Sequence, residues 1–229
     1  MAKSKKYRES AIVGIAIPYY KNSAECEIKF KKLMQKIIEL LNFNNGDKML
    51  VYIYEDGQIS DWLQEYKRSN IIIESCDKNN GVSYARNKCL DYLKDKCLYI
   101  AYIDSDDMLA DDYFKKMYEY CADNTHDIIE TDFWYEGQIL PFLPKVKRCN
   151  VCGSAIKTNI IGKTRFDESL QIGEDTEFMN DVFDLNKHRK KHCPTTYYYQ
   201  LGANPKSLTV SYQRKEIGKE FIKDGKRNN

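Results

Sequence analysis

The sequence has no apolar run close to the roughly 20 residues that a helix needs to cross a bilayer. Its first ten residues, MAKSKKYRES, also lack the apolar stretch of a signal peptide. Charges of the two signs nearly cancel, to a net charge of +2, so no global field indicates nucleic acid or a lipid surface as a general partner. We therefore expect a cytoplasmic protein without a nucleic-acid partner, whose membrane contacts are at most peripheral.

Internal repeats and low-complexity linkers are also lacking, and 229 residues suit one α/β domain with a substantial core. Several of the eight cysteines lie in apolar or amphipathic segments, where a thiol behaves as a small hydrophobic group, so we expect reduced thiols. Cys149 and Cys152 have the spacing of half a zinc site. The nearby His192 and Cys193 are adjacent and poorly placed to complete a tetrahedron, which disfavours zinc.

Four apolar runs of strand length alternate with segments of helical periodicity. The expected strands are 11–18, 49–55, 70–76 and 97–104, and the expected helices between them are 24–43, 59–68 and 81–95. The apolar side of the first helix consists of Ile28, Leu33, Ile37, Leu40 and Leu41. Because parallel neighbours need crossover connections, this alternation predicts an α/β fold with a central, mostly parallel sheet flanked by helices.

Three of the expected strands end in polar residues. PYYK follows the first strand, EDG the second and DSDD the fourth. In parallel sheets ligands bind outside the carboxyl ends of the strands. We therefore expect these polar residues to line one cleft, which is the default position for a functional site.

Asp104 and Asp106 directly follow an apolar strand, where two such carboxylates repel each other unless a cation lies between them. Oxygen-rich pairs of this kind suit Mg²⁺ or Mn²⁺ that carries a substrate diphosphate. An EF-hand is excluded because its glycine and its distal glutamate are missing. The alternative is a solvated turn before a helix whose first turn attracts acidic residues. Those acidic residues would be Asp107, Asp111 and Asp112.

Five segments occur together in a characteristic order: IAIPYYKN, YIYEDG, NNGVSYARNKCLDYL, YIAYIDSDDML and IGEDTEFM. Over residues 11 to 200, the chain thereby resembles the family 2 glycosyltransferases, which have the Rossmann-like fold called GT-A. The resemblance implies a single domain over 1–229. It has a nucleotide-binding half at about 11–132, a smaller acceptor and catalytic half at about 133–212, and a polar tail at 213–229.

The resemblance also implies how the nucleotide of a sugar donor is held. Pro18 and Tyr20 would border the base, and Asp56 would accept a hydrogen bond from its edge. Asn80 and Arg86 would help to hold the nucleotide end. UDP is the donor nucleotide that we expect.

The metal and the departures from the family pattern follow from the same resemblance. Asp106 would bind Mn²⁺ or Mg²⁺ directly, and Asp104 would contact the ribose and the metal shell. Lys21 stands where the family usually has Asn, Glu55 replaces the first Asp of its DDGS stretch, and Gln58 replaces the Ser. These changes bear on the identity of the base and leave the phosphate site intact.

FDESLQIGEDTEFMNDVF supplies a candidate base. Gly173 permits a tight turn before an amphipathic helix over 174–186, which leaves Glu174 and Asp175 at its N-terminus. Taken alone, these acids also suit helix capping. The resemblance implies that Asp175 is the catalytic base and that Glu174 orients the acceptor or the base.

With these residues, the resemblance implies an inverting, metal-dependent transfer of a hexosyl or N-acetylhexosaminyl group from a UDP-sugar. The acceptor would be a hydroxyl group of a glycan, a lipid-linked molecule or a polymer. A non-catalytic module that binds sugar nucleotides or glycans is the alternative, although it would need no base. A nucleotidyltransferase is disfavoured because PYYKNSAE lacks the glycine-rich loop expected after the first strand.

Three segments in the second half of the chain indicate a function less specifically. Residues 187–192, KHRKKH, suit a solvated helix end or a patch for an anionic acceptor or lipid head group. The aromatic segment 133–144 could stack on sugar rings or pack on the core. The segment 197–210 offers weak candidates for contacts to the diphosphate, which are Lys206, Ser207 and Thr209.

Overall fold

A computed structural model describes residues 11–42, 46–135, 137–140, 142, 150–170 and 172–199. The predictions for Cys149, Lys206, Ser207, Thr209 and the tail 213–229 lie outside these residues. The strands are β1 Ala11–Tyr19, β2 Met49–Asp56, β3 Ile71–Cys76, β4 Cys97–Tyr102, β5 Met108–Leu109, β6 Ile128–Tyr135, β7 Gln138–Leu140, β8 Ser154–Lys157 and β9 Lys190–Tyr198. The helices are α1 Ala24–Leu41, η1 Gly46–Lys48 (a 3₁₀ turn), α2 Asp61–Gln64, α3 Val82–Leu93, α4 Tyr113–Ala122, α5 Thr158–Ile161 and α6 Glu174–Val182.

The described strands join one sheet in the order β3-β2-β1-β4-β8-β6-β9-β5, with β7 paired to β6. β1 to β4 are mutually parallel where they pair, and β8 runs antiparallel to both β4 and β6. β6 and β9 pair in parallel. The predicted α/β fold with a mostly parallel sheet flanked by helices is confirmed. The division into a nucleotide half and an acceptor half stays a prediction.

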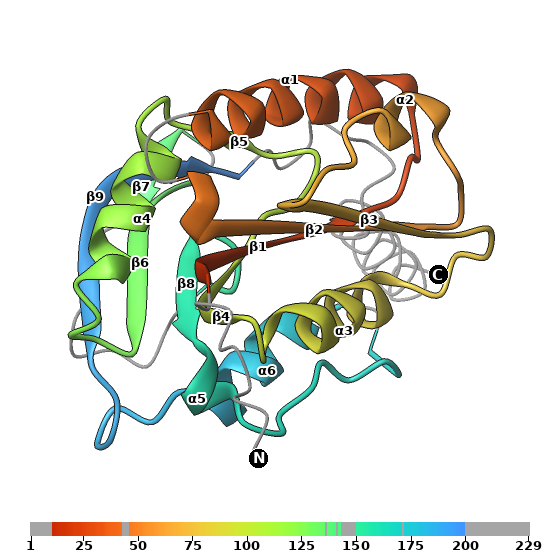
Figure 1. The fold of residues 1–229 in the computed structure, drawn as a ribbon. Coiled ribbons are helices and arrows are strands. Elements are labelled where there is room, and N and C mark those ends of the chain that lie inside the picture. Colours follow the sequence, from red (N-terminus) through yellow and green to blue (C-terminus); the bar gives the residue numbers. More distant parts are fainter. Residues whose placement is uncertain are drawn as a thin grey trace, which may run out of the picture.

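Helices cover both faces of the sheet formed by β1 to β4 (Figure 1). α1 lies over one face, where the Phe30 ring packs 4.3 Å from the ring of Tyr19. Most of its expected apolar side is buried, but Ile28 was wrongly assigned to that side, because its side chain is 56% exposed. Cys26 and Met34 are buried instead, because they share the helix face of Phe30 and Ile37, whereas the 100° step per residue puts Ile28 on the opposite face.

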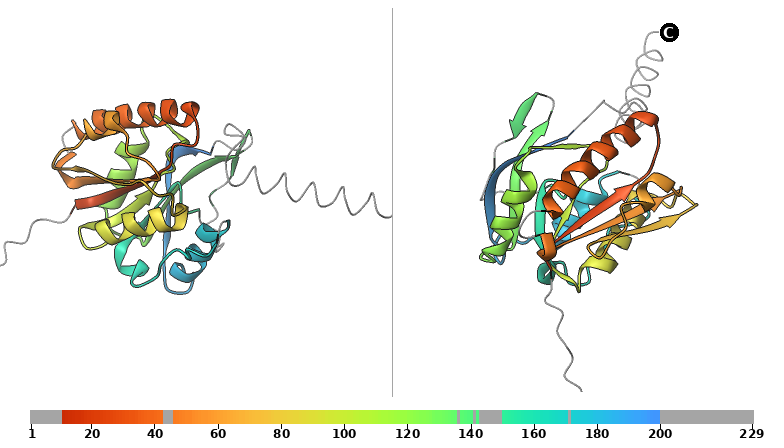
Figure 2. Two further views of the ribbon diagram at one scale, coloured as in Figure 1. Left: turned by 90° about the vertical axis from the view of Figure 1, so that its right-hand side faces the viewer. Right: turned by 45° about the horizontal axis from the view of Figure 1, so that its top comes forward.

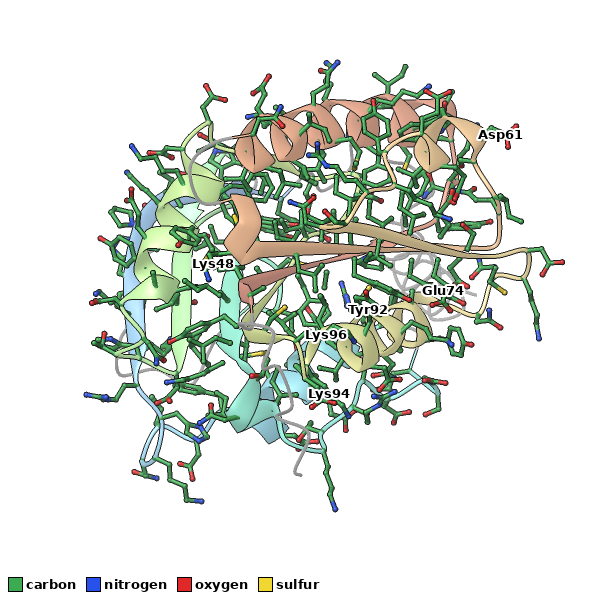
Figure 3. The ribbon with its side chains drawn as sticks, in the orientation of Figure 1. Lys48, Asp61, Glu74, Tyr92, Lys94 and Lys96 are labelled. Carbon is green, nitrogen blue, oxygen red and sulfur yellow. The ribbon has the colours of Figure 1, made fainter. Side chains whose placement is uncertain are left out.

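α3 covers the opposite face (Figure 3). There the ring of Tyr92 stacks 4.4 Å from the ring of Tyr52, whose hydroxyl donates to Glu74 at 2.6 Å. The Lys96 ammonium lies 4.0 Å from the centre of the Tyr92 ring. The stack of Tyr92 on Tyr52 thus joins the last turn of α3 to the sheet.

The second half of the sheet forms a separate wall. β6, β7 and β9 lie side by side with α4 packed against β9 (Figure 2). The expectation of a solvated helix end at 187–192 is wrong, because α6 ends at Val182 and β9 begins at Lys190. The Lys190 ammonium is buried and lies 3.0 Å from Glu130 of β6. The basic run therefore enters the sheet by pairing with an acidic strand.

The second expected helix, over 59–68, is shorter than predicted, because α2 spans one turn.

In the described part of the chain, no helix is long and apolar enough to cross a membrane. The cysteines described are free thiols.

Candidate active site

A cleft of about 770 Å³ opens at the carboxyl ends of β1, β2 and β4. Its size lies within the usual range of about 300 to 1,000 Å³ for ligand sites. All nine predicted site residues line it: Pro18, Tyr20, Asp56, Asn80, Arg86, Asp104, Asp106, Glu174 and Asp175. Parallel strand ends, the N-terminal end of α3 and that of α6 bring these residues together, although they are spread over more than 150 positions of the sequence.

Asp56 organises the nucleotide end of the predicted site. Its buried carboxylate accepts the backbone N–H groups of Asn80, at 2.9 and 3.0 Å, and of Gly81, at 2.8 Å. The Asn80 amide adds a third donor at 3.1 Å. Gly81 has φ +98°, a conformation that other residues rarely adopt, and α3 starts at the next residue. Asp56 therefore fixes the loop that begins α3, and the base contact predicted for it stays a prediction.

The departures from the family pattern have structural partners. The Glu55 carboxylate is fully buried and accepts from the Ser75 hydroxyl at 2.6 Å and from the Ser60 N–H at 3.1 Å. The side-chain oxygen of Gln58 accepts the backbone N–H of Lys21 at 3.1 Å. Glu55 is thus held inside the fold, whereas Lys21 and Gln58 join the loops that follow β1 and β2.

The loop after β1 contributes an exposed aromatic ring. Tyr20 is 45% exposed at the cleft, and its carbonyl accepts from the Cys26 thiol at 3.6 Å. Burial, together with the nearby Asp106 carboxylate, raises the pKa of this thiol to about 11. Cys26 is therefore neutral at physiological pH and packs under the loop.

The acidic loop after β4 is held from the far side of the sheet. The Tyr197 hydroxyl, on β9, donates to the buried Asp107 at 2.7 Å and accepts the backbone N–H of Asp104 at 3.1 Å. Asp107 is therefore neither a helix cap nor a solvated acid, because α4 starts at Tyr113. Sequence reasoning missed Tyr197, and no local signal distinguishes it among eighteen tyrosines.

Arg86 lies between the donor-side and acceptor-side carboxylates. Its guanidinium donates to Glu174 at 2.5 Å and to the two oxygens of Asp104 at 3.0 and 3.3 Å. Burial raises the pKa of Glu174, and the Arg86 charge opposes that rise. The next residue, Asn87, was also missed. Its amide donates to the Phe166 carbonyl at 2.9 Å and so ties α3 to the segment before α6.

Asp175 lies on the first turn of α6. Gly173 precedes the helix with φ +84°, as the predicted tight turn requires. The Asp175 carboxylate accepts the backbone N–H of Thr176 at 2.7 Å and is partly exposed at the cleft. The expected helix over 174–186 is shorter than predicted, because it ends at Val182.

Aromatic side chains from the predicted segment 133–144 also reach the cleft. Phe133 and Tyr135 line it together with Tyr199, and Phe133 stacks on the ring of Tyr197 at 5.6 Å. Phe133 therefore both lines the cleft and packs against the core.

Zinc is not supported in the described ranges, where no three His, Cys, Asp or Glu residues are grouped to hold a metal ion. Cys152 is buried beside Arg86, with its sulfur 3.9 Å from the guanidinium. His192 pairs with Asp132 at 2.7 Å, and Cys193 is buried.

Comparison with known proteins shows what the chain resembles. It is 25% identical over 210 residues to the minor teichoic acid biosynthesis protein GgaB of Bacillus subtilis (strain 168), which covers 82% of this chain and 23% of that protein. It is 22% identical over 221 residues to GgaA of the same strain, which covers 85% of this chain and 48% of that protein. The chain thus spans less than half of either relative.

Solved structures share the fold. Residues 1–349 of S. aureus TarS superpose with a TM-score of 0.65 at 18% identity, over 82% of this chain and 60% of that one. The same protein in complex with UDP-GlcNAc gives a TM-score of 0.63 at 17% identity, over 83% and 59%. The model of the family described as glycosyl transferase family 2 matches residues 15–184, well over half of the chain. The chain therefore belongs to glycosyl transferase family 2 and is a glycosyltransferase with the GT-A fold.

Proposed function

We propose that this glycosyltransferase moves a hexosyl or N-acetylhexosaminyl group from a UDP-sugar to a hydroxyl group of a cell-surface polymer of the teichoic acid class, with inversion. The observation that carries the proposal is the convergence of nine predicted donor-side and acceptor-side residues in one cleft. The teichoic acid relatives support the acceptor class. The UDP and UDP-GlcNAc complexes of TarS support the donor class.

The residues at the cleft fit Mn²⁺ or Mg²⁺. Asp104 and Asp106 offer hard carboxylate oxygens at the end of β4, and both are partly exposed to the cleft. Because the described residues hold no group of three metal-ligating side chains, these two carboxylates would bind an ion together with oxygens of the substrate diphosphate. Mg²⁺ is commonly held in this way. Such an ion neutralises negative charge that develops on the departing diphosphate.

The protein's own groups supply the remaining chemistry. As the acceptor oxygen bonds to the anomeric carbon, its proton passes to the carboxylate of Asp175. The bond from that carbon to the diphosphate oxygen breaks, and its electron pair leaves with UDP. Inversion requires that the acceptor attack from the face opposite the diphosphate, with Asp175 across the sugar from Asp104 and Asp106.

The test is a paired measurement on Asp175→Asn. Asparagine keeps the size but cannot take the proton, so transfer should fall by about 10²- to 10⁴-fold while the dissociation constant for the UDP-sugar is retained. Calorimetry gives the dissociation constant, and release of UDP in the presence of a teichoic acid acceptor gives the turnover. Asp181→Asn is the matched control, since Asp181 lies on α6 outside the cleft.

Each outcome separates the alternatives. Loss of donor binding in step with turnover would make Asp175 a cap of α6, and full activity of the variant would place the base elsewhere. A wild type that binds UDP-sugars but neither transfers nor hydrolyses them would favour the non-catalytic module.

A further inference from the structure

Arg86 makes an unusual contact for a residue assigned to nucleotide binding. Its side chain is 5% exposed and lies between two carboxylates of different elements. Nη1 donates to Glu174 at 2.5 Å, across 88 positions of the chain, and Nη2 donates to both oxygens of Asp104. The guanidinium therefore joins the loop after β4 to the start of α6.

The surroundings of Arg86 favour this bridge as a fixed feature. The centre of its guanidinium lies 5.6 Å from the Phe166 ring, and the Cys152 sulfur lies 3.9 Å from Nη2. A buried cation is costly unless carboxylates compensate it, and here two of them do. The planar guanidinium can serve both at once, which a lysine ammonium on one flexible stem cannot do in the same way.

The start of α6 depends on this contact more than its far end does. Phe178, on the second turn, stacks on Phe166 with ring centres 3.9 Å apart, and Val182 is buried near the end of the helix. The first turn is preceded by Gly173 in a left-handed conformation and has no side-chain cap. Among the described contacts, Glu174 to Arg86 is the ion pair that holds this turn.

We propose that Arg86 is a positioning residue that sets the first turn of α6, and with it Asp175, relative to the donor-side carboxylate Asp104. Glu174 is the anchor for Arg86 on α6 and is not the base. The inference rests on the proposed function, because it takes Asp104 as a donor contact and Asp175 as the base. It replaces the nucleotide contact that the family resemblance implies for Arg86.

Arg86→Lys tests this bridge between Asp104 and Glu174, because it keeps the positive charge but removes the planar guanidinium that contacts both carboxylates. We expect kcat to fall about 10- to 100-fold, since a displacement of about 1 Å at a reacting group has effects of that size. The dissociation constant for UDP should stay within about threefold, because binding and turnover respond separately when only the base is misplaced.

The matched control is Arg165→Lys. Arg165 forms a bidentate ion pair with the carboxylate of Asp91 on α3, and its Nη2 lies 2.7 Å from that carboxylate. This pair is exposed and does not line the cleft. We expect this variant to keep both kcat and UDP affinity. Equal kcat values for the two lysine variants would overturn the bridge.

Glu174 variants test the same inference without changing Arg86. Glu174→Gln still offers an oxygen to the guanidinium, so kcat should stay within about fivefold of the wild type. Glu174→Ala removes the anchor and should lower kcat as far as Arg86→Lys does, with UDP affinity kept. Because the two groups act through one contact, Arg86→Lys/Glu174→Ala should lose no more than the worse single variant.

Results that contradict the inference about Arg86 can be distinguished from results that contradict the proposed function. If Arg86→Lys weakened UDP binding in step with kcat, Arg86 would be a nucleotide contact. If Glu174→Gln fell as far as Asp175→Asn, Glu174 would be the base. Either result overturns the inference, while a wild type that does not bind UDP, or an Asp175→Asn variant with normal turnover, overturns the proposed function. Thermal melting of every variant excludes loss of fold as the cause.

Discussion

Within the four residues DSDD, neighbouring acids have different environments. Asp107 is buried and receives the Tyr197 hydroxyl, whereas Asp106 is partly exposed at the cleft. Asp104 is partly exposed as well, but it has fixed partners: its carboxylate accepts from Arg86, and its backbone N–H donates to the Tyr197 hydroxyl. A single tyrosine on β9 thus sets the shape of the loop that offers carboxylates to the cleft.

Tyr197→Phe should disturb this loop while keeping the ring stack with Phe133. Loss of a hydroxyl shared by a buried carboxylate and a backbone N–H should lower the free energy of unfolding by about 1 to 3 kcal/mol, or Tm by about 2 to 12 °C. Binding of UDP with Mn²⁺ should weaken as well. The control is Tyr198→Phe, since Tyr198 is the neighbour on β9 and points to the other side of the strand. Equal effects of the two changes would contradict the assignment.

Asp106→Asn tests the metal at the residue that is its expected direct ligand. A ligand at 100 times its dissociation constant stabilises a protein by about 2.7 kcal/mol, which raises Tm by about 5 to 10 °C at this chain length. UDP with Mn²⁺ should produce this shift in the wild type and lose it in Asp106→Asn, with little change in Tm without ligand. Asp111→Asn is the control, because Asp111 is exposed and paired with Lys36. An unaltered Mn²⁺ response would remove the metal from the proposal.

At the scale of elements, α6 depends on the glycine that precedes it. Gly173 has φ +84° and Gly162, after α5, has φ +56°, and an added Cβ would meet no atom within 4 Å at either position. Alanine at Gly173 should therefore cost about 1 to 2 kcal/mol through its left-handed conformation alone. Alanine at Gly162 should cost at least as much, because its ψ of −116° lies outside the left-handed helical region. Only Gly173→Ala should also lower kcat, because it shifts the turn that carries Asp175. Turnover of Gly173→Ala as high as that of Gly162→Ala would show that the start of α6 tolerates displacement.

The strands of the first half of the chain could be predicted closely from the sequence. Each of β1 to β4 lies within two residues of its predicted bounds, because a strand buried between helices is a continuous apolar run. β9 could not be predicted in the same way. It begins with basic residues that are neutralised by acidic partners on β6, such as Glu130 with Lys190, and the parallel register shifts between Thr131 and Asp132.

The residues of the site also divide into those that the sequence could predict and those that it could not. Asp56, Asp104 and Asp106 could be placed because they directly follow strands whose carboxyl ends must meet. The contacts of Tyr197 with Asp104 and of Arg86 with Glu174 could not, since they join residues that are 93 and 88 positions apart. No local pattern encodes such pairs.

At the scale of the whole molecule, the cleft runs along the sheet from β2 to the wall of β6 and β9. Asp56 and Tyr20 lie at one end, the acidic loop and Arg86 in the middle, and Tyr199 at the other end. A nucleotide at the first end would place its diphosphate beside the acidic loop. The sugar and the acceptor would then lie between α6 and the aromatic side chains of Phe133, Tyr135 and Tyr199. The proposed transfer requires this sequence of nucleotide, diphosphate, sugar and acceptor along the cleft.

The nucleotide end should therefore select uracil. Asp56 is preset for this role, because three donor groups of Asn80 and Gly81 make four hydrogen bonds to its carboxylate, with the Asn80 N–H shared between both oxygens. An ionised carboxylate has about four acceptor positions, so an N–H group of the base can be the fourth donor. Uracil offers such a group at N3, whereas N3 of cytosine carries no hydrogen.

Calorimetry with UDP, CDP and GDP should give the lowest dissociation constant for UDP. Asp56→Asn should weaken UDP binding and also lower Tm, because the amide replaces one acceptor of the loop by a donor and leaves an N–H group of that loop facing it. Asp77→Asn is the control, since Asp77 is exposed in the loop between β3 and α3. Tighter binding of GDP than of UDP would refute uracil selection. Lys21 and Gln58, which join the loops at this end of the cleft, would then be the residues to exchange.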